Sequence, residues 1–83
     1  MPTVLIVNGW RLFFYSNEGQ EPMHIHACKG EVECKYWLIE KTTEIRKAFF
    51  YNRTPKLEKE IKSIIRNNFN FIVNSWYSHF NNL

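Results

Sequence analysis

The sequence predicts a small α+β domain in which an antiparallel sheet of two or more hairpins precedes a long or kinked C-terminal helix. In the first half, short β-branched and aromatic runs are separated by turn residues. From Thr54 onward, apolar residues recur every three or four positions, which is the period of an amphipathic helix. At 83 residues there is room for one domain, with a β-rich region over 1–52 and a helical region over 54–81.

The first predicted element is a hairpin. Thr3 to Val7 is apolar and β-branched, Asn8 and Gly9 form a favoured two-residue turn, and residues 10–16 are again typical of a strand. Pairing Val7 with Trp10 sorts the side chains into two faces. The core face would hold Leu5, Val7, Trp10, Leu12 and Phe14, and the other face Val4, Ile6, Arg11, Phe13 and Tyr15.

Residues 21–37, EPMHIHACKGEVECKYW, predict a second hairpin that turns at Lys29 and Gly30. If Cys28 lies opposite Glu31, one face is apolar and the other mixed, and an odd shift in register would destroy this sorting. His26 would then face Glu33, and His24 would face Lys35. The apolar face is Ile25, Ala27, Val32, Cys34, Tyr36 and Leu38; the mixed face is His24, His26, Cys28, Glu31, Glu33, Lys35 and Trp37.

Residues 45–51 could add a further strand, with Lys47 protecting its exposed edge. Thr54 followed by Pro55 is typical of a helix start. An unbroken helix over residues 55–80 would be roughly 39 Å long at about 1.5 Å per residue, longer than so small a domain is wide. We therefore expect either a kink near Asn67 and Asn68 or an end that projects toward a partner.

Composition narrows the class of protein. A net charge of +3 is compatible with an acidic partner such as nucleic acid, and it also lies in the ordinary range for a soluble domain. Two cysteines are too few for a disulfide scaffold, and the N-terminal sequence lacks the pattern of a signal peptide. No apolar stretch approaches transmembrane length. These features predict a reduced, cytoplasmic protein without a membrane partner.

The mixed face of the second hairpin is the best candidate site. Histidine exchanges protons near neutral pH, a carboxylate can orient it, and cationic side chains can hold a phosphate. Such a set on a sheet would suit a metal-independent ribonuclease. The candidate residues are His24, His26 and Glu33 for catalysis, and Arg11, Tyr15 and Lys35 for binding nucleic acid or phosphate.

Two simpler interpretations compete with catalysis. The same side chains could be the solvated side of an amphipathic sheet with favourable cross-strand charge pairs. A metal site at His24, His26 and Cys28 would spread three ligands over about 13 Å of strand, so that only neighbours could share an ion. Cys34 would lie on the opposite face, which also argues against a disulfide. We predict no metal and no cofactor.

Aromatic residues suggest two binding modes. Aromatic side chains beside basic ones, such as Tyr36 and Trp37 beside Lys35, could stack on single-stranded nucleic acid, although such residues more often belong to a core. The C-terminal FNFIVNSWYSHFNNL is aromatic and nearly uncharged, so a second chain could complete its apolar surface. Trp76 and Phe80 are the candidate partner-binding residues there.

The order of several motifs resembles a small bacterial family of domains of unknown function. This chain contains MPTVL, GWRLFFYSNE, PMHIHA and ECKYWL, where the family typically opens with MPTV or MPTI and continues with GxRFFFYSNE and PxHIHV. Cys28 departs from the family pattern, which weakens the metal interpretation. The matching positions are Arg11, Phe14, Tyr15, Ser16, Asn17, Glu18, Pro22, His24, His26, Glu33, Lys35 and Trp37.

The resemblance implies a function in a pair of proteins, because family members are commonly encoded beside a second small protein in a toxin–antitoxin-like arrangement. We therefore hypothesise a prokaryotic protein that acts on RNA or translation together with a small partner encoded nearby. The alternative is a non-enzymatic interaction module, such as an antitoxin, a regulator or a subunit, whose aromatic helix binds a partner. Assembly into a homo-oligomer stays open.

Overall fold

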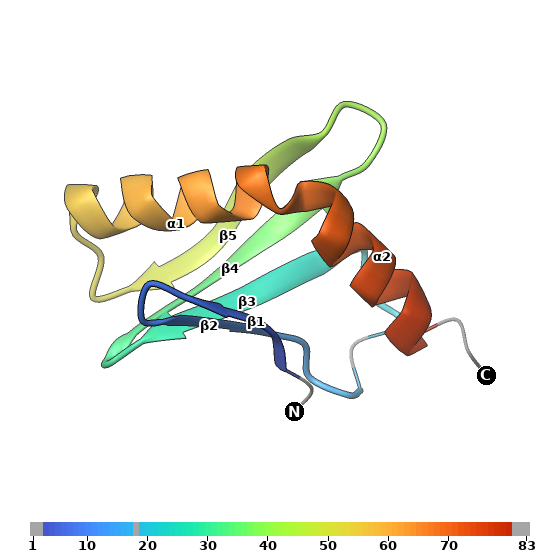
Figure 1. Cartoon of the computed structure of the whole chain (residues 1–83), viewed down its shortest axis with the longest axis horizontal. Helices are drawn as coiled ribbons and strands as arrows, with labels where there is room; N and C mark the ends of the chain where they lie inside the picture. The colour runs from blue at the N-terminus through green and yellow to red at the C-terminus, as the bar shows by residue number, and fades with distance from the viewer. Residues whose placement is uncertain (1–2, 18, 81–83) are drawn as a thin grey trace.

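The computed structural model describes residues 3–17 and 19–80 and consists of a five-stranded antiparallel sheet followed by two helices (Figure 1). The α+β prediction is confirmed. Met1, Pro2 and Glu18 of the family motifs, and Asn81 of the predicted helical region, lie outside the described residues. The elements are β1 (Thr3–Val7), β2 (Trp10–Phe13), β3 (His24–Lys29), β4 (Val32–Ile39), β5 (Glu44–Tyr51), α1 (Pro55–Asn67) and α2 (Phe69–Phe80).

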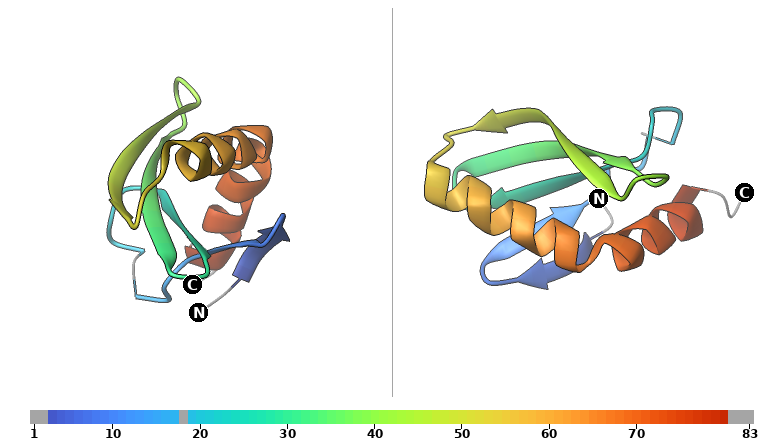
Figure 2. Two further views of the ribbon diagram at one scale, coloured as in Figure 1. Left: turned by 90° about the vertical axis from the view of Figure 1, so that its left-hand side faces the viewer. Right: turned by 90° about the horizontal axis from the view of Figure 1, so that it is seen from above.

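Each strand pairs with the next one in sequence, so the sheet has the order β1-β2-β3-β4-β5. Both helices lie on the same side of the curved sheet, as the end-on and top views show (Figure 2). The opposite side of the sheet carries no helix, and we call it the open face. The expected strand over residues 45–51 is confirmed as β5, which forms one edge of the sheet.

The first hairpin has the predicted register, with Val7 opposite Trp10. Asn8 and Gly9 both have positive φ angles, 51° and 82°, as a type I′ turn requires. One assignment was wrong: the register shifts between Thr3 and Leu5, and Val4 packs against the core instead of sharing the outer face with Ile6. A bulge inserts one extra residue into a strand and so interrupts the alternation of side chains.

The second hairpin is shifted by two residues from the expected register. Lys29 pairs with Val32, and the turn is made by residues 30 and 31, so Cys28 lies opposite Glu33. The predicted facing pairs His26–Glu33 and His24–Lys35 were therefore wrong. Gly30 has a φ of 59°, and glycine at the first central position suits a type II′ turn. Because the shift is even, the predicted sorting of β3 and β4 into two faces is confirmed.

Replacing Gly30 by Ala is expected to lower the free energy of unfolding by about 1–2 kcal/mol, the cost of a left-handed backbone at a residue with a Cβ atom. A Cβ atom at Gly30 would meet nothing within 4 Å, so the loss would come from the backbone alone. Urea denaturation measures it. Glu31→Ala, in the same turn, serves as the control, and equal losses in the two variants would contradict the assigned turn.

The core lies between the sheet and the helices. Helix α1 contributes its apolar side, where Ile61 and Ile65 are fully buried, and the sheet contributes alternate residues of the central strands. Trp10 closes one side of this core, and its indole N–H donates to the Glu60 carboxylate at 2.6 Å. The buried cluster comprises Trp10, Leu12, Phe14, Ile25, Ala27, Cys34, Tyr36, Leu38, Ile61, Ile64, Ile65, Phe69, Ile72, Val73 and Trp76.

The C-terminal helix is kinked at Asn68, which is one of the two expected geometries. The Asn68 side-chain amide donates to the Ile64 carbonyl at 2.8 Å and so satisfies the end of α1. The Asn68 carbonyl accepts the Ile72 N–H at 2.9 Å at the start of α2. A single residue thus ends one helix and begins the next, which lets α2 turn along the end of the sheet (Figure 1).

Glu58 on α1 ties the helix to the edge strand and to the preceding loop. Its carboxylate accepts hydrogen bonds from Lys47 at 2.8 Å and from Arg53 at 2.7 Å. These hydrogen bonds, first that from Lys47 and then that from Arg53, lower the pKa of Glu58 to about 2. Lys47, expected to protect the edge of β5, lies on that edge strand and is bound to the helix through Glu58.

The lowered pKa of Glu58 predicts acid sensitivity. A carboxyl group with a pKa of about 2 in the folded protein and 4.5 when unperturbed stabilises the fold fully above about pH 4.5. This contribution is lost as the pH falls from about 4.5 to about 2, so Glu58→Gln should flatten this part of the stability profile. Urea midpoints measured over that range test the prediction, with Glu31→Gln as the control. An unchanged profile in Glu58→Gln would contradict it.

Candidate functional site

The two histidines predicted as a catalytic pair lie on the open face but are buried. His24 and His26 are 0% and 3% exposed, and their ring centroids are 5.1 Å apart. The His24 Nδ1 atom lies 2.9 Å from the Pro22 carbonyl. Since a carbonyl only accepts, the His24 Nδ1 atom is the donor of this hydrogen bond and carries a proton.

Aromatic rings surround this histidine pair. His26 stacks on Phe13 with centroids 5.4 Å apart and meets the edge of Tyr15 at 4.7 Å. His24 contacts Trp37 on the open face at 5.5 Å and Trp76 of α2 at 5.0 Å. The histidines therefore form the centre of a small aromatic cluster, which joins the sheet to α2 where the short strand β2 has ended.

The predicted phosphate-binding cations also lie on the open face, where each covers an aromatic ring. The Arg11 guanidinium lies 4.7 Å from the centroid of Phe13, and the Lys35 ammonium lies 4.3 Å from that of Trp37. Lys35 already pairs with Glu21 of the preceding loop at 2.8 Å. Its side chain is 12% exposed, so a phosphate would have to displace a carboxylate to reach it.

The structure thus brings all six predicted site residues onto one face of the sheet. Glu33 lies opposite Cys28 and Tyr51, two positions along the strand from the Lys35–His26 pair. Burial separates the two imidazoles from solvent, whereas an acid or base in catalysis has to come within hydrogen-bond reach of its substrate. The charge of the open face is also mixed, because Glu21, Glu33 and Glu44 accompany its cations.

The cysteines lie on opposite faces of the sheet, as predicted, and both are free. Cys34 is in the core, where burial chiefly raises the pKa of its thiol to about 12 and keeps it protonated. Cys28 is on the open face beside Arg11. Within residues 3–17 and 19–80, no group of three or more His, Cys, Asp or Glu side chains could hold a metal ion.

The two aromatic residues predicted to bind a partner mostly contact their own chain. Trp76 is 6% exposed, and its ring packs against Phe14 at 5.3 Å and Phe80 at 4.3 Å. Phe80 is half-buried in the same cluster. The aromatic residues of α2 that face solvent are Phe71 and Tyr77. The apolar surface available to a partner is therefore smaller than the sequence suggested, and it lies elsewhere on the helix.

A basic surface along α1 was not among the sites predicted from the sequence. Residues 53–66 carry five Lys and Arg side chains and two Glu, so their charge of +3 equals that of the whole chain. Helix α1 and the preceding loop enclose a cavity of about 220 Å³. Its charged lining residues are Arg53, Glu58, Lys59, Lys62 and Arg66, which we call the basic groove.

The cations of the basic groove are largely available. Glu58 is neutralised by Lys47 and Arg53. Among the described residues, no carboxylate lies within 4.0 Å of Lys59, Lys62 or Arg66. The segment PKLEKEIKSIIR contains the signal, because its cations recur at helical spacing away from the isoleucines. The prediction of the helix rested on the apolar side of this segment and assigned no role to its polar side.

These features define a class: a small α+β protein with an antiparallel five-stranded sheet, a kinked helix on one side and a basic groove on that helix. Neither described helix is long and apolar enough to cross a membrane. The family model for the domain of unknown function DUF4160 matches residues 9–77, and the chain belongs to this family. No curated protein and no solved structure matches the chain.

Proposed function

We propose that this protein binds RNA through the basic groove of α1, and that it does so as part of a two-protein, toxin–antitoxin-like prokaryotic module. The observation that carries the RNA proposal is the concentration of the chain's entire net charge on residues 53–66. Sequence-independent affinity for nucleic acids comes mainly from cations that replace the counterions of phosphates. The open face offers fewer available cations for this purpose.

The spacing of the groove cations suits a phosphate backbone. Lys59, Lys62 and Arg66 follow one another at intervals of three and four residues, so they lie along one side of the helix over roughly 10 Å of its axis. That length corresponds to a few successive phosphates of one strand. Arg66 can bind a phosphate through two parallel hydrogen bonds, whereas the lysines act as point charges.

Binding without cleavage is the form of the proposal that the burial of His24 and His26 favours. An acid–base pair for RNA cleavage would have to touch the reacting ribose and phosphate. The burial of both rings instead suits a role in holding β3, β4 and α2 together. Incubation with labelled RNA tests this directly: cleavage that disappears in both His24→Ala and His26→Ala would establish the ribonuclease hypothesis in its place.

The test of RNA binding compares two triple variants that remove the same charge from opposite sides of the sheet. One is Lys59→Gln, Lys62→Gln and Arg66→Gln in the basic groove, and the other is Arg11→Gln, Lys35→Gln and Arg46→Gln on the open face. Fluorescence anisotropy with a labelled single-stranded RNA is measured over a range of salt concentrations. Weaker binding in the groove variant alone supports the proposal, and weaker binding in the open-face variant alone contradicts it.

The module proposal rests on the family resemblance and has its own test. We expect the chain to co-purify with a small protein encoded beside it and to change growth differently when expressed with and without that neighbour. Absence of a complex, together with identical growth in both conditions, would contradict the module while leaving RNA binding open to its own measurement.

A further inference from the structure

The two edges of the sheet differ in how well they are protected from pairing with another strand. Edge strand β5 carries Glu44, Arg46 and Lys47, and Lys47 is tied to α1 through Glu58. Strand β1 forms the opposite edge, and its sequence TVLIV contains neither a charged residue nor proline. Charges and proline are the usual features that keep an edge strand from pairing with another chain. Edge β1 lacks both, and beyond the bulge between Thr3 and Leu5 its regular part, residues 5–7, can accept an added strand.

Ile6 is the central residue of this regular part of β1, residues 5–7. Val7 pairs with Trp10 across the two-residue turn, so the backbone groups of Val7 face β2. Alternation along an antiparallel ladder then directs the N–H and C=O groups of Ile6 away from the sheet. The Ile6 side chain is also 71% exposed. An incoming strand would find hydrogen-bonding groups and an apolar side chain at the same position.

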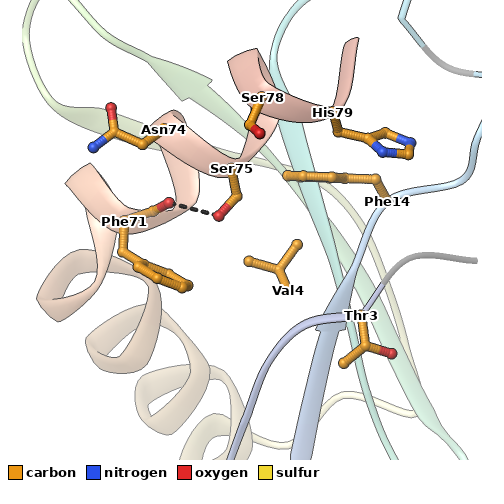
Figure 3. Close-up of a pocket in the computed structure, with 8 residues that line it drawn as sticks. All are labelled: Thr3, Val4, Phe14, Phe71, Asn74, Ser75, Ser78 and His79. Carbon is orange, nitrogen blue, oxygen red and sulfur yellow. Dashed lines mark hydrogen bonds between the residues drawn. The ribbon is translucent and has the colours of Figure 1, made fainter. Parts of the chain in front are cut away.

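A neutral cavity lies beside this edge, between β1 and α2 (Figure 3). It has a volume of about 500 Å³, and Thr3 and Val4 line it on the strand side. Phe71, which is 52% exposed, lines it on the helix side, and none of its lining residues is Lys, Arg, Asp or Glu. Such a lining suits uncharged side chains beside an added strand.

We infer that the occupant is β1 of a second copy, paired antiparallel to the first about a two-fold axis, so that two sheets join into one continuous sheet. The second β1 is uncharged, which suits a cavity lined by no Lys, Arg, Asp or Glu, and it brings its own outward-facing Ile6 groups. The net charge of the chain equals that of residues 53–66, whereas beside this edge Arg11 of β2 lies opposite Ile6. A two-fold contact is self-complementary and leaves neither β1 edge exposed.

The dimer would also affect RNA binding. This consequence rests on the proposed function, whereas the dimer itself does not rest on it. A two-fold axis that relates antiparallel copies of one strand is perpendicular to the sheet. Both α1 helices therefore lie on the same side of the joined sheet, and the two basic grooves could engage one RNA. Simultaneous engagement of two sites raises apparent affinity even though each site binds as before.

Sedimentation velocity of the full chain over a wide concentration range tests the dimer. The wild type should approach twice its 10.1 kDa mass. Ile6→Pro removes an outward-facing N–H that the β1–β2 ladder does not use, and Ile6→Lys places a charge at the same exposed position. We expect each substitution to weaken dimerisation at least 10-fold, whereas Tyr51→Lys on the opposite edge, where Tyr51 is 60% exposed, should leave it unchanged.

Circular dichroism verifies that each variant is folded, and Ile6→Lys decides the question if Ile6→Pro is unstable, because an exposed side chain can be replaced without loss of packing. A wild type that stays monomeric at every concentration would overturn the inference. Dimers that persist in folded Ile6→Lys, or that dissociate in Tyr51→Lys, would overturn it too. RNA binding by a monomeric variant would leave the proposed function standing without the dimer.

Discussion

Replacing Lys59, Lys62 and Arg66 by Gln is expected to weaken the binding of single-stranded RNA about 100-fold at about 0.1 M salt. The magnitude follows from counterion release, because each phosphate of a single strand that a cation neutralises adds about 0.7 to the salt slope of log affinity. Removing three such cations should therefore reduce the slope by about 2. Anisotropy titrations at several salt concentrations measure affinity and slope in one experiment.

The open-face variant of Arg11, Lys35 and Arg46 is the matched control, because it removes the same formal charge. If affinity depended on net charge alone, both variants would bind RNA equally weakly, and the basic groove would have no special status. A slope that stays at the wild-type value in the groove variant would show that its cations do not contact phosphates. Circular dichroism of both variants verifies that the fold is retained.

Replacing Trp76 by Ala is expected to lower the free energy of unfolding by about 3–5 kcal/mol, the usual cost of removing a buried aromatic side chain. Trp76 is 6% exposed and joins Phe14, Phe80 and His24 into one cluster. Urea denaturation measures the loss, and Trp76→Phe should recover part of it because a ring remains. This is the largest stability effect that we expect from a single substitution in α2.

Tyr77→Ala serves as the control, because Tyr77 is the next residue on α2 and is 40% exposed. It should cost less than about 1 kcal/mol, as surface substitutions usually do. The comparison also distinguishes a core residue from a partner-binding residue. If Trp76→Ala left stability unchanged but abolished a protein complex, the assignment of Trp76 to a partner surface would be correct.

Local rules accounted for most of the secondary structure. The Asn8–Gly9 turn fixed the first hairpin, because both residues accept positive φ angles that suit a type I′ turn. The helix began at Thr54 and Pro55, where the Thr54 hydroxyl accepts the Leu57 N–H at 3.2 Å. The kink at Asn68 followed from poor helix propensity combined with a side chain that can satisfy a carbonyl.

In the second hairpin, local sequence rules predicted the faces of the strands but not the cross-strand partners. Its two faces were sorted correctly although its turn was placed one residue early, which moved the pairing by two positions. Side chains alternate with a period of two, so an even error leaves each residue on its own face. The partner across the strand changes even so, and for that reason the predicted pairs His26–Glu33 and His24–Lys35 do not form.

The sequence by itself determined the α+β class, the faces of β3 and β4 and the place where the helix breaks, because these depend on neighbours along the chain. The tertiary structure decided that His24 and His26 are buried, since Trp76 and Tyr15 reach them from other segments. It also showed that the cations of α1 enclose a groove. Burial and charge clustering depend on how distant segments pack, which no local pattern specifies.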